Sequence, residues 1–328
     1  MKLQIFALII LFTQAGLGQN TPNTSPAAPT TATEPTKPAP LPEPTLANVP
    51  YGPHERQVLD FWKADSQNPA PVLFFIHGGG WVRGDKASVG GMVKRCLSAG
   101  ISVVSINYRY TWQAQLAEVK PPVEWPLKDA ARALQFVRSK AQDWHINPKR
   151  IGASGGSAGA CSSLWLAFHS DMAAPKSSDP IAHESTRLWC AAVDGAQTSL
   201  DPLQLKEWTP NSRYGGHAFG FMNPADLATR DTRFAEFLEH RADVLSWIKE
   251  FSPFEHAAAG APPIYLNYAE PPGLGQEQKD PTHTSNYGVK LQEKLQTLGV
   301  PCELVYPGAP EVLHKSSLDY LLEKLRLP

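Results

Sequence analysis

The sequence has little of what marks metal-binding, nucleic-acid-binding or membrane-spanning proteins. Its formal net charge is −1, so no basic excess favours nucleic acid or an anionic membrane surface. It has only four cysteines, none at the short spacing of a metal site. The apolar stretch at residues 3–12 is too short to span a bilayer. We therefore expect no nucleic-acid partner, no metal and no stable membrane insertion.

The first fifty residues differ in composition from the rest. Met1-Lys2 precedes the apolar stretch, and Gly16-Leu17-Gly18 offers the small residues of a cleavage site. We expect a signal peptide over residues 1–18, cleaved near Gly18, and a periplasmic or secreted protein, with an uncleaved anchor as the alternative. Residues 19–50 are Pro-, Thr- and Ala-rich, and they have too few apolar groups to offset their ordering entropy. This segment is predicted to be a disordered linker.

From residue 51 onward, strand and helix patterns alternate. Residues 71–76 and 101–106 read as buried strands, and residues 127–142 read as an amphipathic helix. This alternation predicts an α/β domain over residues 51–328, with a mostly parallel sheet and helices on both faces. About sixty residues separate the apolar strand near Val193 from the one near Ile264, which predicts a cap-like insertion over residues 198–260.

The cysteines are expected to be mostly buried, reduced thiols. Three of the four sit in or beside predicted core elements, where a free cysteine behaves as a small hydrophobe. Export would permit disulfides, but the sequence suggests no pairing. The sequence also does not indicate an oligomeric state.

The most informative motif is Gly155-Gly156-Ser157-Ala158-Gly159. Gly-x-Ser-x-Gly places a serine on a strained turn between a strand and a helix, and glycines on either side leave room for that turn. A short strand pattern precedes the motif and a small-residue helix pattern follows it. The pattern predicts that Ser157 is a catalytic nucleophile.

A second motif, His77-Gly78-Gly79-Gly80-Trp81, follows the apolar strand at residues 71–76. Such a loop forms an oxyanion hole with the amide that follows the nucleophile. Fixed N–H donors stabilise the negative charge that acyl transfer builds on a carbonyl oxygen. We predict Gly79, Gly80 and Ala158 as the donors, and we expect His77 to brace the loop.

The base and the acid should follow the serine in the chain. His314 lies between a predicted strand at 302–306 and a final helix at 316–327, so it is the predicted base. His283 is weaker because it precedes a predicted helix at 289–298, and His217 and His256 are weaker still. For the acid, Glu270 is favoured because it closely follows the strand at 263–268. Asp280 is the alternative, and Asp194 and Asp201 are less favoured.

Six segments together resemble one known family. They are His77-Gly78-Gly79-Gly80-Trp81, Gly84-Asp85-Lys86, Ser105-Ile106-Asn107-Tyr108-Arg109, Trp125-Pro126-Leu127-Lys128-Asp129, Asn147-Pro148-Lys149-Arg150-Ile151 and the motif around Ser157. Over residues 51–328 the chain resembles the α/β-hydrolase superfamily, on the carboxylesterase side that includes hormone-sensitive-lipase-like and BD-FAE feruloyl-esterase-like groups. The resemblance implies no metal and no organic cofactor. The family's Gly-x-x-Asp signature at the acid loop is replaced here by Tyr268-Ala269-Glu270-Pro271-Pro272.

These features predict an exported serine esterase that acts on short-acyl or aryl esters of small molecules or glycans. Trp81, Trp208 and Tyr214 are expected to line the substrate pocket, although Trp208 and Tyr214 fit the cap's own small core equally well. The irregular acid loop motivates one alternative, a catalytically silent binding protein of the same fold. A peptidase on this fold is the other.

Overall fold

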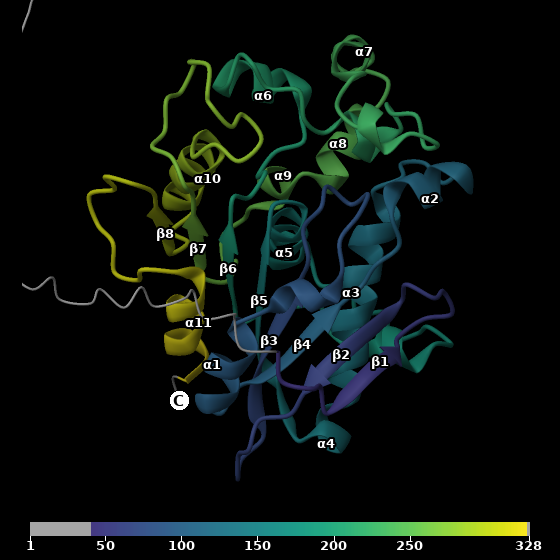
Figure 1. Cartoon of the computed structure of the whole chain (residues 1–328), viewed down its shortest axis with the longest axis vertical. Helices are drawn as coiled ribbons and strands as arrows, with labels where there is room; N and C mark the ends of the chain where they lie inside the picture. Colours follow the sequence, from purple (N-terminus) through teal and green to yellow (C-terminus); the bar gives the residue numbers. More distant parts are fainter. Residues whose placement is uncertain (1–40, 327–328) are drawn as a thin grey trace, which may run out of the picture. The chain divides into compact units, whose positions relative to one another are not determined.

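An eight-stranded sheet organises residues 41–326, the part of the chain that the computed structural model describes. The strand order is β1-β2-β4-β3-β5-β6-β7-β8 (Figure 1). The strands are β1 Leu46–Pro50, β2 Val58–Trp62, β3 Ala70–Ile76, β4 Ser102–Ile106, β5 Ile146–Gly156, β6 Cys190–Asp194, β7 Ile264–Asn267 and β8 Cys302–Val305. β2 is antiparallel to both neighbours, and all pairs from β4 to β8 are parallel.

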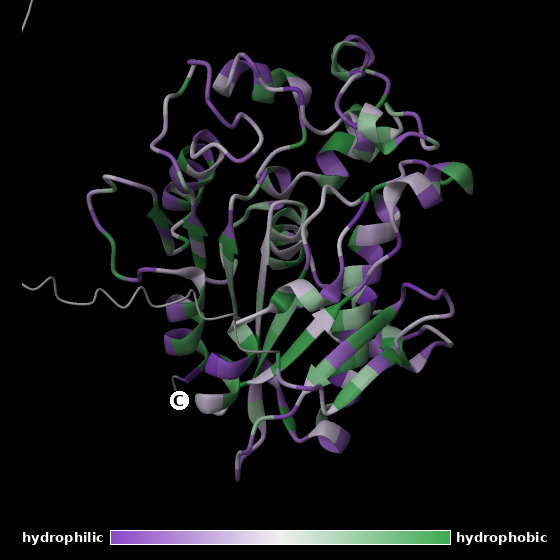
Figure 2. Cartoon of the chain, in the orientation of Figure 1, coloured by the Kyte–Doolittle hydropathy of each residue, from purple (hydrophilic) through white to green (hydrophobic). Residues whose placement is uncertain are grey.

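The central strand β3 shows why the sheet is buried on both faces. Its side chains alternate between the two sides, so Phe74 and Ile76 enter one apolar cluster while Leu73 and Phe75 enter the other. Both clusters exclude water, which accounts for a continuous apolar run rather than an alternating one. In Figure 2 the hydrophobic colour is concentrated in β2, β3 and β4, whereas the loops at the top of the view are mostly hydrophilic.

Helices cover both faces of the sheet. Apolar residues of α3, α5 and α10 pack in the first cluster, and those of α1 and α11 pack in the second. The helices are α1 Met92–Ser98, α2 Thr111–Leu116, α3 Glu124–Ser139, α4 Ala141–Trp144, α5 Ala158–Phe168, α6 Pro202–Trp208, α7 Phe234–Glu239, α8 Leu245–Phe251, α9 Pro253–His256, α10 Asn286–Thr297 and α11 Ser317–Arg326, with 3-10 turns at Lys86–Val89, Pro180–His183, Gly216–Phe219 and Leu227–Thr229. The predicted α/β architecture is confirmed.

The stretch between β6 and β7, called the cap stretch below, contains the residues expected to form a cap. α6, α7, α8 and α9 fall within it and are all short, and in Figure 1 α6 and α7 lie at the top, beyond the upper ends of β6 and β7. Main-chain hydrogen bonds tie this stretch to the rest of the domain: Val123 N donates to Ala218 O at 3.0 Å, and Gly275 N donates to Trp208 O at 3.0 Å. The boundaries 198–260 as a separate cap remain a prediction.

The folded part begins earlier than the sequence suggested. β1 lies inside the expected linker at 19–50, yet it pairs with β2 at the sheet edge. Asn48 N donates to Asp60 Oδ1 at 2.8 Å, and Trp62 Nε1 donates to Pro42 O at 2.7 Å. The linker boundary was therefore wrong, because backbone pairing at an edge needs few apolar side chains. The predicted signal peptide and linker residues 19–40 lie outside the described residues.

All four cysteines are free thiols, and Cys96, Cys161 and Cys190 are buried. Within residues 41–326, no helix combines the length and the apolar character needed to cross a membrane.

Candidate active site

Ser157 sits on a sharp turn between β5 and α5. It has φ 54° and ψ −123°, a region that residues other than glycine rarely adopt. Its backbone N donates to Asp194 O at 3.0 Å, and its own carbonyl accepts from Cys161 N at 2.9 Å. The surrounding hydrogen bonds thus hold a strained residue at the carboxyl end of a central strand, the geometry of a nucleophile elbow.

The glycines on either side of Ser157 are required by close packing. A Cβ built on Gly155 would lie 2.3 Å from Ile76 O, and one on Gly159 would lie 2.0 Å from the same oxygen. Real Cβ atoms do not approach a carbonyl oxygen so closely. The elbow can therefore lie against the end of β3 only when both positions lack a side chain.

His283 and Asp280 complete a line of three polar groups with Ser157. His283 Nε2 lies 2.9 Å from Ser157 Oγ, and His283 Nδ1 lies 2.8 Å from Asp280 Oδ2. The other oxygen of Asp280 accepts from the backbone N of Thr282 at 3.1 Å and of His283 at 3.2 Å. Serine, imidazole and carboxylate thus have the connectivity of a Ser-His-Asp triad.

The loop that carries this pair is anchored to the start of the cap stretch. Gln197 Nε2 donates to Thr282 O at 2.7 Å. Gly195, with φ 58°, passes so close that a Cβ there would lie 3.3 Å from the Cβ of His283. These contacts come from the segment after β6, so the β6 and β7 connections together fix the imidazole.

The prediction that His314 lies beside Ser157 is wrong. His314 Nδ1 lies 2.7 Å from Glu303 Oε2, and its Nε2 lies 2.7 Å from Glu323 Oε2. Both ring nitrogens are therefore occupied by carboxylates of β8 and α11. The imidazole at Ser157 comes from the connection after β7, in the segment that precedes α10. His283 was ranked below His314 as a candidate base because it precedes that helix.

The favoured acid, Glu270, does not reach the site either. Its side chain is half exposed, and its ion pair is with Lys279 at 3.7 Å. The alternative, Asp280, is the carboxylate that meets the imidazole. Asp194 instead accepts from Asn267 and Ser317, and Asp201 caps α6 and pairs with Arg241. The sequence does carry a signal: Asp280 and His283 are three residues apart in a turn directly before a helix.

Asp280 is held in its ionised form. Partial burial raises the pKa of its carboxyl group, but the hydrogen bond from His283, the charge of His283 and the two backbone N–H donors lower it more. The net pKa lies below the ordinary value of an aspartate. At neutral pH the imidazole therefore faces a carboxylate anion, which favours a proton on Nδ1.

The glycine loop, residues 77–81 after β3, lies directly against the elbow around Ser157. A Cβ on Gly78 would lie 2.7 Å from Gly156 O and 3.5 Å from the Cβ of Ser157. Gly79 and Gly80 have φ values of 101° and 62°, which favour glycine. The loop is thus placed where an oxyanion hole would be. The assignment of the N–H groups of Gly79, Gly80 and Ala158 as its donors remains a prediction.

His77 lies beneath the loop with its side chain buried. Its Nδ1 is 2.7 Å from Gly78 O, and its ring stacks on Tyr108 at 4.2 Å. Burial lowers the pKa of His77 to about 4, so the ring is neutral at neutral pH. Tyr108 also donates its hydroxyl to His77 O at 2.8 Å. These contacts suit the bracing role expected of His77.

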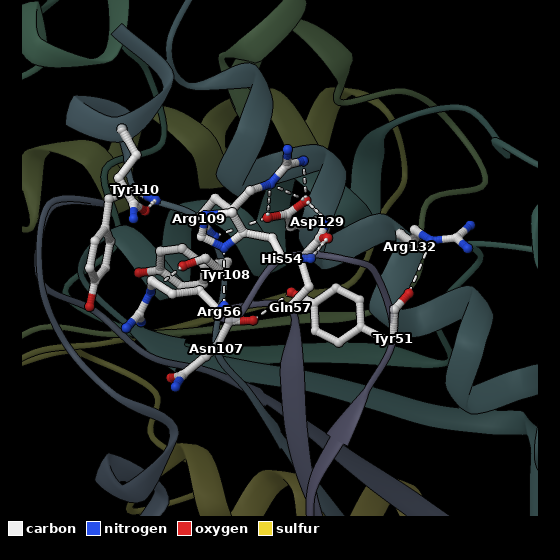
Figure 3. A network of polar contacts seen from close by, with 11 residues as sticks. Tyr51, His54, Arg56, Gln57, Asn107, Tyr108, Arg109, Tyr110, Asp129 and Arg132 are labelled. Carbon is white, nitrogen blue, oxygen red and sulfur yellow. Dashed lines mark hydrogen bonds and ion pairs between the residues drawn. The ribbon is translucent and has the colours of Figure 1, made fainter. Parts of the chain in front are cut away.

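A network of polar and charged side chains supports Tyr108 (Figure 3). Arg56 Nε donates to Tyr108 O at 2.8 Å. The neighbouring Arg109 holds Asp129 through its backbone N and its guanidinium, and Gln57 Nε2 donates to the same carboxylate at 2.7 Å. Asp129 is almost fully buried, and a buried charge is tolerated only when it is paired and hydrogen-bonded. Residues 105–109 and 125–129, two of the segments that carry the family resemblance, thus meet here to hold the glycine loop.

The aromatic residues expected to line the substrate pocket are all buried. Trp81 donates its indole N–H to Ser162 Oγ at 3.0 Å, and its ring lies 6.4 Å from that of Tyr214. Trp208 packs edge-on against Phe254 at 5.4 Å. These contacts describe a packed core that Trp81 shares with residues of the cap stretch. Contact of Trp81, Trp208 or Tyr214 with a substrate remains a prediction.

Comparisons with known proteins identify relatives of this chain. Residues 59–295 match the BD-FAE family model, a range that contains Ser157, Asp280 and His283 and ends before His314. The chain is 26% identical to Esterase LipQ of Mycobacterium tuberculosis over 287 residues, which cover 83% of this chain and 57% of that protein. It is 27% identical to Esterase LipC of the same organism over 230 residues, which cover 66% of this chain and 49% of LipC. The chain thus spans about half the length of these curated relatives.

Solved structures share the fold. A truncated carbohydrate esterase from gut microbiota has a TM-score of 0.62 at 19% identity, with 85% of this chain and 95% of that chain covered. An acetyl ester-xyloside bifunctional hydrolase from Caldicellulosiruptor lactoaceticus has a TM-score of 0.56 at 24% identity, with 76% of each chain covered.

Proposed function

We propose that this chain, which belongs to the BD-FAE family and has the α/β-hydrolase fold, is a serine hydrolase of carboxylic esters. One observation carries the proposal: Ser157 Oγ lies 2.9 Å from His283 Nε2, and His283 Nδ1 lies 2.8 Å from Asp280 Oδ2. A serine hydroxyl is a weak nucleophile until a hydrogen-bonded base accepts its proton. The arrangement supplies that base and orients it.

Acylation follows from these contacts. Ser157 Oγ attacks the ester carbonyl carbon while its proton passes to His283 Nε2. The Asp280 carboxylate keeps the other ring proton on Nδ1 and stabilises the imidazolium. When the tetrahedral intermediate collapses, the bond to the alkoxy oxygen breaks, and His283 gives the proton to the leaving alcohol. An acyl group remains on Ser157.

Deacylation repeats these steps with water. His283 takes a proton from the water molecule, whose oxygen attacks the acyl carbon, and the proton then returns to Ser157 as the acid leaves. In both halves the negative charge on the carbonyl oxygen is stabilised by the N–H groups of Gly79, Gly80 and Ala158.

The proposed substrates are short-acyl or aryl esters, with those carried by glycans favoured. Two fold neighbours, a carbohydrate esterase and an acetyl ester-xyloside hydrolase, bear names of this kind. The N-terminal sequence supports an exported enzyme, released after cleavage near Gly18. The alternative of a silent binding protein is less favoured, because Asp280 supplies a carboxylate to His283 Nδ1 although the acid signature is absent.

The test is active-site labelling of the full chain with a fluorophosphonate, followed by hydrolysis of p-nitrophenyl acetate, butyrate and octanoate. We expect one label on the wild type, none on Ser157→Ala, and turnover that falls with acyl length. Acetylated and feruloylated glycans are then compared at matched concentrations. A folded wild-type protein that takes no label and turns over no ester contradicts the proposal.

A further inference from the structure

A second cluster of polar side chains lies at the other end of the helix that starts beside Ser157. His169 directly follows α5, Glu250 lies in α8 and His256 ends α9. Each offers one ligand atom, and these atoms all lie within 4.8 Å of one another. The rings of His169 and His256 are 4.7 Å apart. Three elements thus bring two imidazoles and one carboxylate together.

The backbone fixes which nitrogen of each ring carries the proton. His169 Nδ1 lies 2.8 Å from Ser170 O, and His256 Nε2 lies 2.6 Å from Glu250 O. A carbonyl oxygen only accepts, so these nitrogens are the N–H donors, which leaves His169 Nε2 and His256 Nδ1 as the ring atoms that can ligate an ion. Histidines that ligate metals are oriented in this way, with the second nitrogen donating to a carbonyl or carboxylate.

The free nitrogen of His169 then faces a second acceptor. Its Nε2 lies 3.3 Å from Glu250 Oε1. Either a proton on Nε2 or a metal cation between the two atoms makes this contact favourable. Two ligands about 2.0–2.1 Å from a tetrahedral Zn²⁺ are about 3.3 Å apart. The separation therefore suits two ligands of one ion.

The cluster is both braced and accessible. Trp165 donates its indole N–H to Glu250 O at 2.9 Å, and its ring lies 4.7 Å from that of His169. The Glu250 side chain is 45% exposed, whereas that of His169 is 11% exposed. A cavity of about 700 Å³, lined in part by His256 and Glu255, borders the cluster. The exposed carboxylate and the cavity give an ion a path from solvent.

We propose that His169, Glu250 and His256 bind one divalent transition-metal ion, with Zn²⁺ as the best match to two imidazoles and one carboxylate. The ion ties the end of α5 to α8 and α9, and so links the helix that begins next to Ser157 to the end of the cap stretch. No sequence motif predicts the cluster, because His169 and Glu250 are 81 residues apart and His256 follows Glu250 by 6. The site does not depend on the proposed ester hydrolysis.

The experiment uses the full chain without a polyhistidine tag, treated with EDTA and dialysed. Zn²⁺ is titrated by calorimetry into the wild type, His169→Gln, His256→Gln and Ser157→Ala. His240→Gln is the matched control, because His240 also pairs with a carboxylate, Asp243, at 2.9 Å but has no second imidazole beside it among the residues described. We expect one ion per wild-type chain, at least a tenfold weaker affinity in the first two variants, and no change in the other two.

Two further readouts keep the outcome decisive if a variant folds poorly. Saturating Zn²⁺ should raise the Tm of the wild type by several degrees, since an ion that binds only the folded state stabilises it. Co²⁺ in place of Zn²⁺ should give the visible absorption of a low-coordinate site in the wild type. Absence of binding to the wild type overturns the proposal, and so does binding that survives unchanged in well-folded His169→Gln and His256→Gln. Binding lost only in Ser157→Ala would place the ion at the nucleophile and overturn it as well.

Discussion

Two histidines late in the chain each have a carboxylate at Nδ1, and they differ in what lies at Nε2. His283 has Asp280 on one side and the hydroxyl of Ser157 on the other. His314 has Glu303 on one side and Glu323 on the other. Burial alone would lower the pKa of His314, but its two carboxylates raise it above the ordinary value. His314 is therefore suited to remain a cation that joins β8 to α11, whereas His283 has a nitrogen free to take a proton.

The comparison teaches that an imidazole–carboxylate pair does not by itself mark a catalytic base. Such pairs also serve as structural ion pairs, and the group at the second nitrogen decides between the two roles. Position in the chain is a weaker guide than that second contact.

The largest expected effect separates the two histidines directly. His283→Gln should reduce kcat for p-nitrophenyl acetate by about 10⁴-fold or more, because the base is lost from a set of residues that acts as a unit. His314→Gln is the matched control and should stay within a few fold of the wild type. Steady-state kinetics on both variants, with circular dichroism to check folding, tests this. A severe loss in folded His314→Gln alone would reverse the assignment.

The next effect concerns the two acids. Asp280→Asn should lower kcat on the order of 10⁴-fold, since the imidazole then takes the wrong tautomer. Glu270→Gln removes a carboxylate that pairs only with exposed Lys279 and should change kcat by no more than a few fold. The same ester assay compares them, and equal losses would mean that neither residue alone orients His283.

A smaller effect tests whether the elbow holds Ser157 in reach of His283. Gly159→Ala would place a Cβ 2.0 Å from Ile76 O, so we expect destabilisation of about 1–3 kcal/mol from overpacking. Gly91→Ala is the control, because a Cβ there meets nothing within 4 Å. Urea unfolding of both variants gives the two free energies. Equal stability of Gly159→Ala and the wild type would show that the elbow can shift.

The smallest effect sharpens the role of His314. Because its pKa is raised in the folded protein, its ion pairs stabilise the fold fully below its unfolded pKa of about 6.5. This stabilisation is lost as the pH rises through the higher folded value. The difference in unfolding free energy between wild type and His314→Gln should thus be larger at pH 6 than at pH 9, by about 1 kcal/mol or less. A difference independent of pH would contradict the ion-pair role.

The sequence predicted the parts of the site that are local. The Ser157 elbow and the glycine loop each occupy a few consecutive residues whose backbone needs glycine, so their signal is contained in the motif. The buried strands were predicted for the same reason, since continuous apolar runs mark central parallel strands. The base and acid were misplaced because their positions depend on how the connection after β7 folds back toward β5. That path is set by contacts such as Gln197 to Thr282, which connect distant segments.

Strand β1 was missed for a different reason. Leu46–Pro50 has no apolar periodicity, and its place is decided by backbone pairing with β2. A composition-based boundary therefore put the start of the folded part too late.

The packing of the elbow has one more consequence. Side chains introduced at Gly155 and at Gly159 would both press on the same atom, Ile76 O. A shift of the end of β3 that accommodates one of them also relieves part of the clash from the other. The two substitutions should therefore be coupled, with a double mutant less destabilised than the two single mutants together. A sequence that loses one of these glycines is then under weaker selection to keep the other.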